Sequence, residues 1–379
     1  MYAALASGTK SLTLRRYLEF IALLLLAGLI FWWFGRGVDW AQVRTAVGQC
    51  DWRLIGAASA IICAAYLVRA FRWRALLAPL TPASIRELFV ATTVGFTAVF
   101  LVGRMGEVVR PVVLPMRDRR VRPGAAFVTI MVERIYDSMT VLLLFALNLL
   151  WFRLPANSVA ELSRVRATGA VLVVTALVGL GVLVWFKRSS EGIVAWLDAA
   201  LTRWRIIPRR LKRALLSLLQ QLAVALSVLA NRRDLAVTTG WSLLLWLSVS
   251  VANMLVFRAF GMPFGLSETL FVLGWSMVGS VVPTPGGAAG AFHAATAAGL
   301  LFLGIERSQA VGIAIILHLV DFAPAVIFGL YYFLRGDINV SRLRHLASTE
   351  AVEHAVEDDK IRPLPGLRSE DLETAVAGK

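Results

Sequence analysis

The sequence predicts an all-α integral membrane protein with about six full spans and two broken-helix hairpins that re-enter the membrane. Three observations support this fold class. The chain of 379 residues is 58% hydrophobic and only 17% charged, which is more apolar material than a soluble core of this length can bury. Apolar stretches of about 20 residues, the length that crosses a bilayer, recur along it. Two further apolar stretches are interrupted by Gly, Pro and charged residues, which break helices.

The full spans follow a short basic segment, residues 1–16, that we expect to lie in the cytoplasm. No small-residue cleavage site follows the first apolar stretch, so we expect it to be retained. The predicted spans are residues 17–35, 54–74, 125–152, 168–187, 235–259 and 308–334.

The two interrupted stretches are residues 88–110 and 268–304, broken by Gly-Arg-Met-Gly-Glu at 103–107 and Pro-Thr-Pro-Gly-Gly at 283–287. Lipid cannot satisfy the backbone polar groups that such breaks release, so these groups must contact protein or a wet cavity. Basic clusters mark the cytoplasmic side. Placing them there makes the first stretch a hairpin from the cytoplasmic side and the second a hairpin from the outer side, with both termini cytoplasmic. Two extra full spans for either stretch remain the alternative.

This arrangement divides the membrane domain, residues 17–336, into two similar halves, 17–152 and 168–334. Each half holds two spans, a broken hairpin and one span with acidic residues. Three full spans per half is an odd number, so the halves have opposite orientations. Inverted repeats with discontinuous helices are typical of secondary transporters. An inverted repeat is therefore a hypothesis for this chain.

Two segments lie outside the spans. Residues 191–231 carry leucines at helical spacing beside basic residues, which predicts an amphipathic cytoplasmic element on the inner leaflet. A plain interfacial linker and a sensor of anionic lipid are both open interpretations. Residues 337–379 are polar and acidic, which predicts a disordered cytoplasmic tail. The net charge of +15 falls in clusters between apolar runs, which favours anionic lipid over nucleic acid as the partner.

Charged residues inside the span 125–152 are candidate site residues. Glu133, Arg134 and Asp137 lie eight to twelve residues from its start, which is about 12–18 Å along a helix. A charge at that depth costs on the order of 3 kcal/mol, so each needs a partner or water. Arg134 and Asp137 are three residues apart and can pair.

The first hairpin adds Arg104, Glu107 and Arg110, which recur at every third position. Together with the charged residues of the span they make three cations and three anions. A purely structural ion-pair network explains this balance. The other interpretation, which we favour, is that an arginine fork binds a phosphate transiently while a carboxylate exchanges with it.

Arg69, Arg72 and Arg74 close the second span. Arginines at the end of a span bury their stems and place their charge among the headgroups. We therefore expect these three to reach the inner headgroups rather than to form a site.

In the second hairpin, Pro283 and Pro285 remove backbone donors, while Gly286 and Gly287 permit conformations closed to other residues. A helix that begins directly after them would present free N–H groups to an anionic headgroup. A plain tight turn is the alternative.

His293, His318 and Asp321 are candidate proton-relay residues in the second half. A histidine in a membrane can also simply form a hydrogen bond across helices. Metal ligation lacks a third ligand, and Cys50 and Cys63 show no metal or disulfide spacing, so we expect no metal and no cofactor.

Four motifs occur in a fixed order: Arg-Trp-Arg-x-Leu-Leu at 72–77, Gly-Arg-x-Gly-Glu-x-x-Arg at 103–110, Glu-Arg-x-x-Asp at 133–137 and Pro-Thr-Pro-Gly-Gly at 283–287. Taken together, they resemble the lysylphosphatidylglycerol synthase transmembrane-region family over residues 15–336. The resemblance implies an all-helical membrane protein that moves or handles lipids or lipid-linked precursors. It implies site roles for Arg104, Glu107, Arg110, Glu133, Arg134, Asp137, Gly286 and Gly287. Many members carry a Glu near the place of His293. The aminoacyl-transfer domain of the true synthases does not fit into residues 337–379, so we do not expect lipid aminoacylation.

Two function classes follow. The first is a flippase-like protein of the cytoplasmic membrane that translocates or handles an anionic lipid or a lipid-linked precursor, without being an enzyme. The second is an intramembrane enzyme or accessory subunit that acts on a lipid-linked phosphate or sugar, for which Glu133, Asp137 and His293 are the good candidates. A homo-oligomer is compatible with either class.

Overall fold

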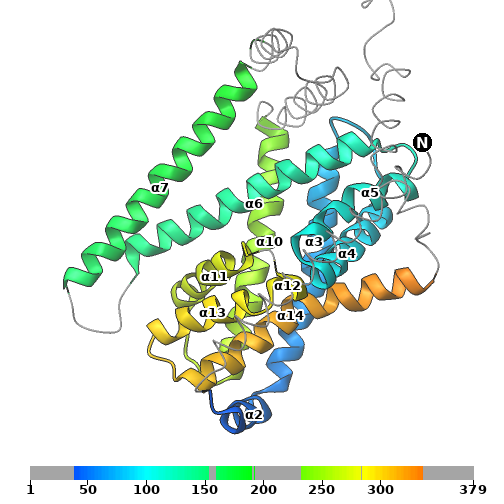
Figure 1. Ribbon diagram of the computed structural model, residues 1–379. Coiled ribbons are helices and arrows are strands. Elements are labelled where there is room, and N and C mark those ends of the chain that lie inside the picture. Colours follow the sequence, from blue (N-terminus) through cyan, green and yellow to red (C-terminus); the bar gives the residue numbers. More distant parts are fainter. Residues whose placement is uncertain (1–37, 153–158, 190–191, 193–231, 283, 336–379) are drawn as a thin grey trace, which may run out of the picture.

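The structure is a computed structural model that describes residues 38–152, 159–189, 192, 232–282 and 284–335 (Figure 1). Every regular element in these ranges is a helix, which confirms the predicted all-α class. The predictions for residues 1–16, 17–35, 191–231 and 337–379, and for Pro283, lie outside the described residues.

In the described part of the chain, three helices are long and apolar enough to cross a membrane: α3 (Trp52–Leu77), α10 (Arg232–Ala259) and α14 (Arg307–Leu334). Two more long helices, α6 (Pro123–Trp151) and α7 (Val159–Arg188), form an antiparallel pair (Figure 1). These five helices coincide with five of the predicted spans. The protein is therefore a multi-pass membrane protein, while the full number of spans stays a prediction.

Helices α3 and α10 pack along each other at the centre of the molecule. Fully buried alanines on both helices, such as Ala58, Ala65 and Ala252, let the two backbones approach closely. At one end the backbone N–H of Asp51 donates to the carbonyl of Ala259 at 2.9 Å. This pair is the scaffold against which the two hairpins are placed.

The first hairpin consists of α4 (Ile85–Val102), the 3₁₀ turn η1 (Gly103–Val108) and α5 (Val109–Arg117). Its two ends meet. The hydroxyl of Thr81 donates to the carbonyl of Arg120 at 2.9 Å, and Arg117 forms an ion pair with Glu87. The ends of this segment thus form a closed base on one side of the molecule, with η1 as the tip.

The second hairpin consists of α11 (Leu266–Ser280), the short turn α12 (Pro285–Ala288) and α13 (Ala291–Phe302), and its two arms pack on each other. A Cβ at Gly279 of α11 would lie 2.5 Å from the carbonyl oxygen of Ala291, so glycine permits this close approach. Helices α5, α11 and α13 have 9, 15 and 12 residues, fewer than the roughly 17 that the shortest spans need. Their lengths favour hairpins over extra full spans.

The two bases lie at opposite ends of α6. This helix starts next to the first base, and at its other end the amide of Asn148 donates to the carbonyl of Ser267 at 2.9 Å, while Phe152 stacks on Phe271. Helix α14 runs back from the second hairpin, so that Tyr332 meets Phe89 of α4. The tips meet between the bases, since α12 contacts both α4 and η1. The inverted repeat itself stays a prediction.

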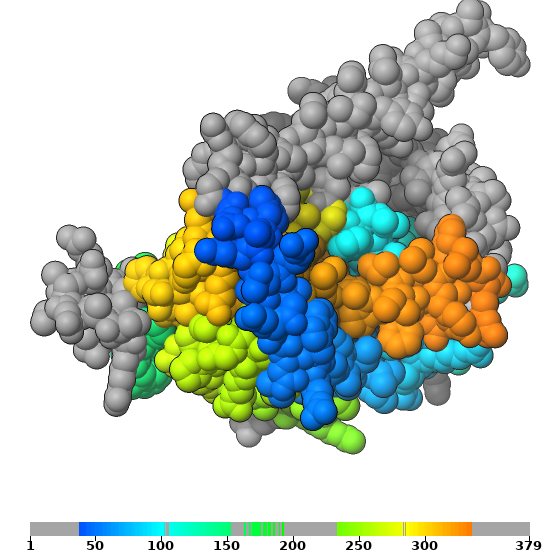
Figure 2. Space-filling view, turned by 90° about the horizontal axis from the view of Figure 1, so that it is seen from below, coloured from blue at the N-terminus to red at the C-terminus, as the bar shows by residue number. Residues whose placement is uncertain are grey.

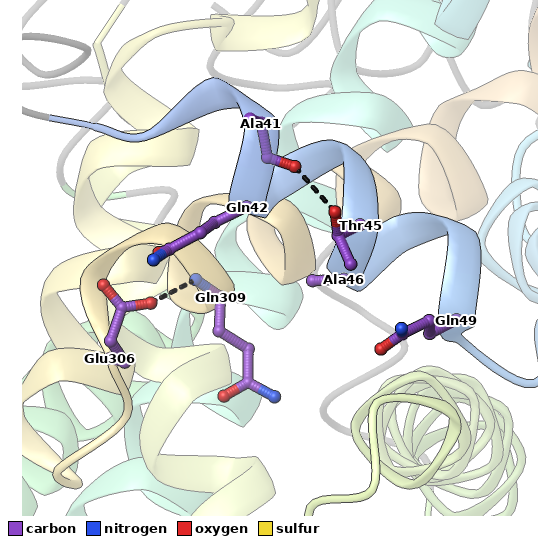
Figure 3. A pocket seen from close by; sticks show the side chains of 7 residues that line it. All are labelled: Ala41, Gln42, Thr45, Ala46, Gln49, Glu306 and Gln309. Carbon is purple, nitrogen blue, oxygen red and sulfur yellow. Dashed lines mark hydrogen bonds between the residues drawn. The ribbon is translucent and has the colours of Figure 1, made fainter.

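Helix α2 (Trp40–Gln49) lies across the end of the molecule where α14 begins, and Figure 2 shows this face. An open pocket of about 340 Å³ lies between α2 and the first turn of α14 (Figure 3). Gln42 and Gln49 line one wall, and Glu306 and Gln309 line the other. The predicted site residues lie elsewhere.

Candidate functional site

Glu133 of α6 is fully buried, and three arginines share its carboxylate. Arg110 of α5 binds it with both guanidinium nitrogens, Nη1 to Oε1 at 2.9 Å and Nη2 to Oε2 at 3.1 Å. Arg134 Nη2 lies 2.8 Å and Arg72 Nη2 of α3 lies 3.2 Å from Oε1. One carboxylate therefore ties the first hairpin and α3 to the long helix α6.

Asp137, one turn further along α6, is the second anion of the cluster. Arg72 binds it through Nη1 at 2.5 Å and Nη2 at 3.1 Å, and Arg134 Nη2 lies 3.0 Å from Oδ2. The predicted pairing of Arg134 with Asp137 is confirmed. The indole N–H of Trp246 on α10 also donates to Oδ1 at 3.1 Å. The cluster thus connects four elements that are distant in sequence.

The prediction that Arg72 reaches the headgroups is wrong. Its side chain is 0% exposed, because α3 continues to Leu77 and the two carboxylates of α6 face it. Arg74, two residues later, is exposed. Trp73 is buried as well, with its indole N–H donating to Thr129 at 3.0 Å and its ring 4.6 Å below the Arg110 guanidinium. The signal for this placement in the sequence is the motif at 72–77, which holds both Arg72 and Trp73.

Adding Arg72 changes the charge balance that the sequence predicted. In the ion pairs given above, three arginines share two carboxylates. Glu107 of η1 is half-buried and lies within electrostatic range of Arg134, so it adds a negative charge beside them. Arg104 belongs to the same turn, and its side chain is outside the described residues. At least four of the six predicted charges, Arg110, Glu133, Arg134 and Asp137, therefore meet directly in the described part of the chain.

Gly95 of α4 is a second residue that sequence reasoning missed. A Cβ there would lie 2.0 Å from Cγ of Arg110, so only glycine lets the arginine pass α4 and reach Glu133. A single glycine in an apolar helix gives no signal that would have marked it as part of a site. The next residue, Phe96, places its ring 5.6 Å from the Arg110 guanidinium carbon.

At the tip of the second hairpin, Gly286 and Gly287 have φ angles of 76° and 65°, in the left-handed region. This explains the two glycines of the motif, and Pro285 begins the turn. A Cβ at Gly287 would also lie 2.9 Å from the ring of Phe322. The following helix begins at Ala291 and not directly after Gly287, so the expected row of free N–H groups is displaced from the motif.

The two histidines join this tip to α14. The Nδ1 of His293 lies 3.4 Å from the backbone N–H of Gly290 and caps α13, while His318 Nε2 lies 3.2 Å from the carbonyl of Gly287. Their ring centroids are 4.8 Å apart. Asp321 follows one turn after His318. A proton-relay role for these three stays a prediction, and among the described residues no three His, Cys, Asp or Glu side chains are grouped to hold a metal.

A family profile described as "Lysylphosphatidylglycerol synthase TM region" matches residues 20–329. The chain belongs to this family. The match confirms the resemblance drawn from the four motifs, and it makes the protein a membrane protein of a family related to lipid handling. Searches of curated proteins and of solved structures found no match to the chain.

Proposed function

We propose that this member of the lysylphosphatidylglycerol synthase transmembrane-region family translocates or handles an anionic lipid, or a lipid-linked precursor, across the cytoplasmic membrane. The observation that carries the proposal is the buried cluster on Glu133 and Asp137, in which three arginines share two carboxylates. Apolar packing in the same place would be as stable as this network, and charges at such depth usually serve a function. Guanidinium forks match the geometry of a phosphate.

The contact between the two hairpin tips supports the same proposal. Broken helices whose tips meet between the two faces of a protein are the usual way in which secondary transporters build a substrate site. We expect the headgroup to pass along these tips while its tails stay in the bilayer. The transport would be driven by a gradient or by the lipid equilibrium itself.

The experiment is a transport assay with the purified protein in vesicles that contain a trace of fluorescent phosphatidylglycerol. A reagent that bleaches only the outer leaflet measures redistribution, and mass spectrometry of the extracted lipid checks its identity. We expect faster redistribution than in protein-free vesicles, with the lipid unaltered. A lipid that stays in place would contradict the proposal for this substrate, and a chemically altered lipid would support the enzyme alternative.

The variant Arg134→Ala separates a functional cluster from a structural one. Arg134 is the most exposed of its three arginines, at 34%, and without it Glu133 keeps Arg110 while Asp137 keeps Arg72. We therefore expect a folded protein that has lost transport. The control Arg120→Ala removes a side chain that is 62% exposed and should leave transport intact. Aggregation of the Arg134 variant would indicate a purely structural network.

A further inference from the structure

Arg69 of α3 differs from the arginines of the cluster. It lies one turn before Arg72, and its guanidinium carbon is 4.9 Å from the ring centroid of Tyr66 and 5.2 Å from that of Phe96. Its Nη1 is buried, yet in the part of the chain that the structure describes it has no hydrogen-bond partner. Arg72, Arg110 and Arg134, in contrast, each donate to a carboxylate.

Two anions lie within electrostatic range of Arg69, Asp137 of the cluster and Asp321 on α14. Asp321 lies within electrostatic range of Arg69, but the described residues contain no ion pair between the two. Tyr66 holds this arrangement in place, since its hydroxyl donates to the backbone carbonyl of Asp321 at 3.0 Å. Both Arg69 and Asp321 are partly exposed, so neither residue is sealed inside the protein.

A guanidinium in this position needs an acceptor. Aromatic faces attract a cation but accept its hydrogen bonds weakly, and a buried charged donor without an acceptor is costly. The ring of Phe96 contacts both Arg69 and Arg110, so the unpartnered donor of Arg69 lies directly beside the arginines of the cluster. A phosphodiester carries one negative charge and two acceptor oxygens that match a guanidinium fork. It would accept hydrogen bonds from Arg69 and place a negative charge beside the arginines of the cluster.

We propose that Arg69 binds the phosphate of a lipid headgroup, and that Asp321 is the counter-charge of Arg69 when no phosphate is bound. This inference rests on the proposed function and names its headgroup subsite, between α3, α4 and α14. It adds to the arginines that bind Glu133 and Asp137 a further arginine, which we had expected among the headgroups.

Native mass spectrometry of the purified protein in detergent tests the subsite without any transport step. The probes are short-chain phosphatidylglycerol and, for comparison, phosphatidylcholine. We expect wild-type protein to retain phosphatidylglycerol, and Arg69→Gln to weaken this binding by about tenfold or more, the usual loss for one charge-assisted bond. The matched control Arg74→Gln, an exposed arginine on the same helix, should bind as the wild type does.

Two more variants keep the test decisive if Arg69→Gln does not fold. Arg69→Lys retains the charge but not the fork, so it should bind phosphatidylglycerol more weakly than wild type. Asp321→Asn removes the repelling carboxylate and should bind it more tightly. Unchanged binding in either folded variant, or in Arg69→Gln, would overturn the inference.

Inorganic phosphate as a competitor separates the two sources of the same chemistry. Retention of phosphatidylglycerol against excess inorganic phosphate supports a lipid subsite. Displacement of the lipid would assign the site to free phosphate and overturn the inference that a lipid headgroup binds there. The proposed function fails separately. Wild-type protein that binds phosphatidylglycerol through Arg69 but never redistributes it would contradict transport and leave the subsite standing.

Discussion

Glu133 shows how much of this molecule depends on single side chains. It is fully buried and faces Arg72, Arg110 and Arg134. A neutral side chain in its place would leave Arg110 without a carboxylate partner among the described residues. We expect Glu133→Gln to destabilise the folded protein by about 3–5 kcal/mol, the usual loss when one member of a buried pair is removed. Thermal unfolding in detergent measures the change.

The matched control for this variant is Glu87→Gln. Glu87 is also paired with an arginine, Arg117, but both side chains are partly exposed, whereas Glu133 is fully buried. A partly exposed pair costs less to break than a fully buried one, so the control should unfold closer to the wild type than Glu133→Gln does. Equal unfolding temperatures for the two variants would show that Glu133 is not the centre of the network.

Gly95 gives a second prediction at this scale. In Gly95→Ala the new methyl group would lie 2.0 Å from Cγ of Arg110, so the arginine must move away from Glu133. We expect a loss of about 1–3 kcal/mol, as for other overpacked sites. Gly240→Ala on α10 is the control, since nothing lies within 4 Å of its Cβ position and alanine favours a helix. If both variants unfold alike, the close passage of Arg110 is not essential.

Individual residues were the least predictable part of the site. The depth of Glu133 and Asp137 in an apolar stretch follows from counting along a helix, and the structure brings both together with Arg134. Arg72 could not be placed in the same way. A residue near the end of a span is equally suited to headgroups and to a buried anion, and the choice depends on which helix packs beside it.

At the scale of elements, the breaks were predictable and the arms were not. Glycine and proline end helices for local reasons, so the tips at 103–107 and 283–287 follow from the sequence alone. The first hairpin, in contrast, extends to Arg117 and not to 110, because α5 tolerates Pro111 in its first turn and continues through Pro115. Tertiary contacts such as the pair of Arg117 with Glu87 decide where that arm stops.

The first turn of α14 supplies a prediction on pH. Glu306 caps this helix and lies just outside its apolar part, with its carboxylate accepting from the backbone N–H groups of Ser308 at 3.0 Å and Gln309 at 3.1 Å. These bonds, that of Ser308 above all, hold the pKa of Glu306 below its ordinary value. The stabilisation is therefore complete above the unfolded-state pKa, about 4.3, and is lost as the pH falls through the lower folded-state value.

The variant Glu306→Ala makes this testable. At about pH 7 it should lose about 0.5–2 kcal/mol of stability, the usual effect of removing a helix cap. The difference from wild type in unfolding temperature should shrink as both proteins are acidified below about pH 4. A difference that stays constant down to about pH 3 would mean that the ionised carboxylate is not what stabilises α14.

At the scale of the whole molecule, the long helices connect two faces. Helix α6 runs from the base of the first hairpin to the base of the second, and α14 runs back. Large apolar side chains on α7, including Val171, Val174 and Val178, are exposed, as contact with lipid requires. Hydropathy predicted the helices, but only their packing shows that the hairpin bases lie at opposite ends of α6. Which end faces the cytoplasm remains a prediction from the basic clusters.

Labelling of single cysteines tests this topology, after Cys50 and Cys63 are replaced by alanine. Pro79→Cys and Arg119→Cys flank the first hairpin, and Pro263→Cys and Arg307→Cys flank the second, all at exposed positions. With a membrane-impermeant maleimide on intact cells, we expect the second pair to react and the first pair to react only after the membrane is opened. The reason is that each hairpin returns to the side from which it came, while α6 and α14 carry the chain across. If one of two positions that flank the same hairpin reacts from outside and the other only from inside, that segment crosses the membrane. If all four positions react from the same side, the two hairpins do not enter from opposite faces.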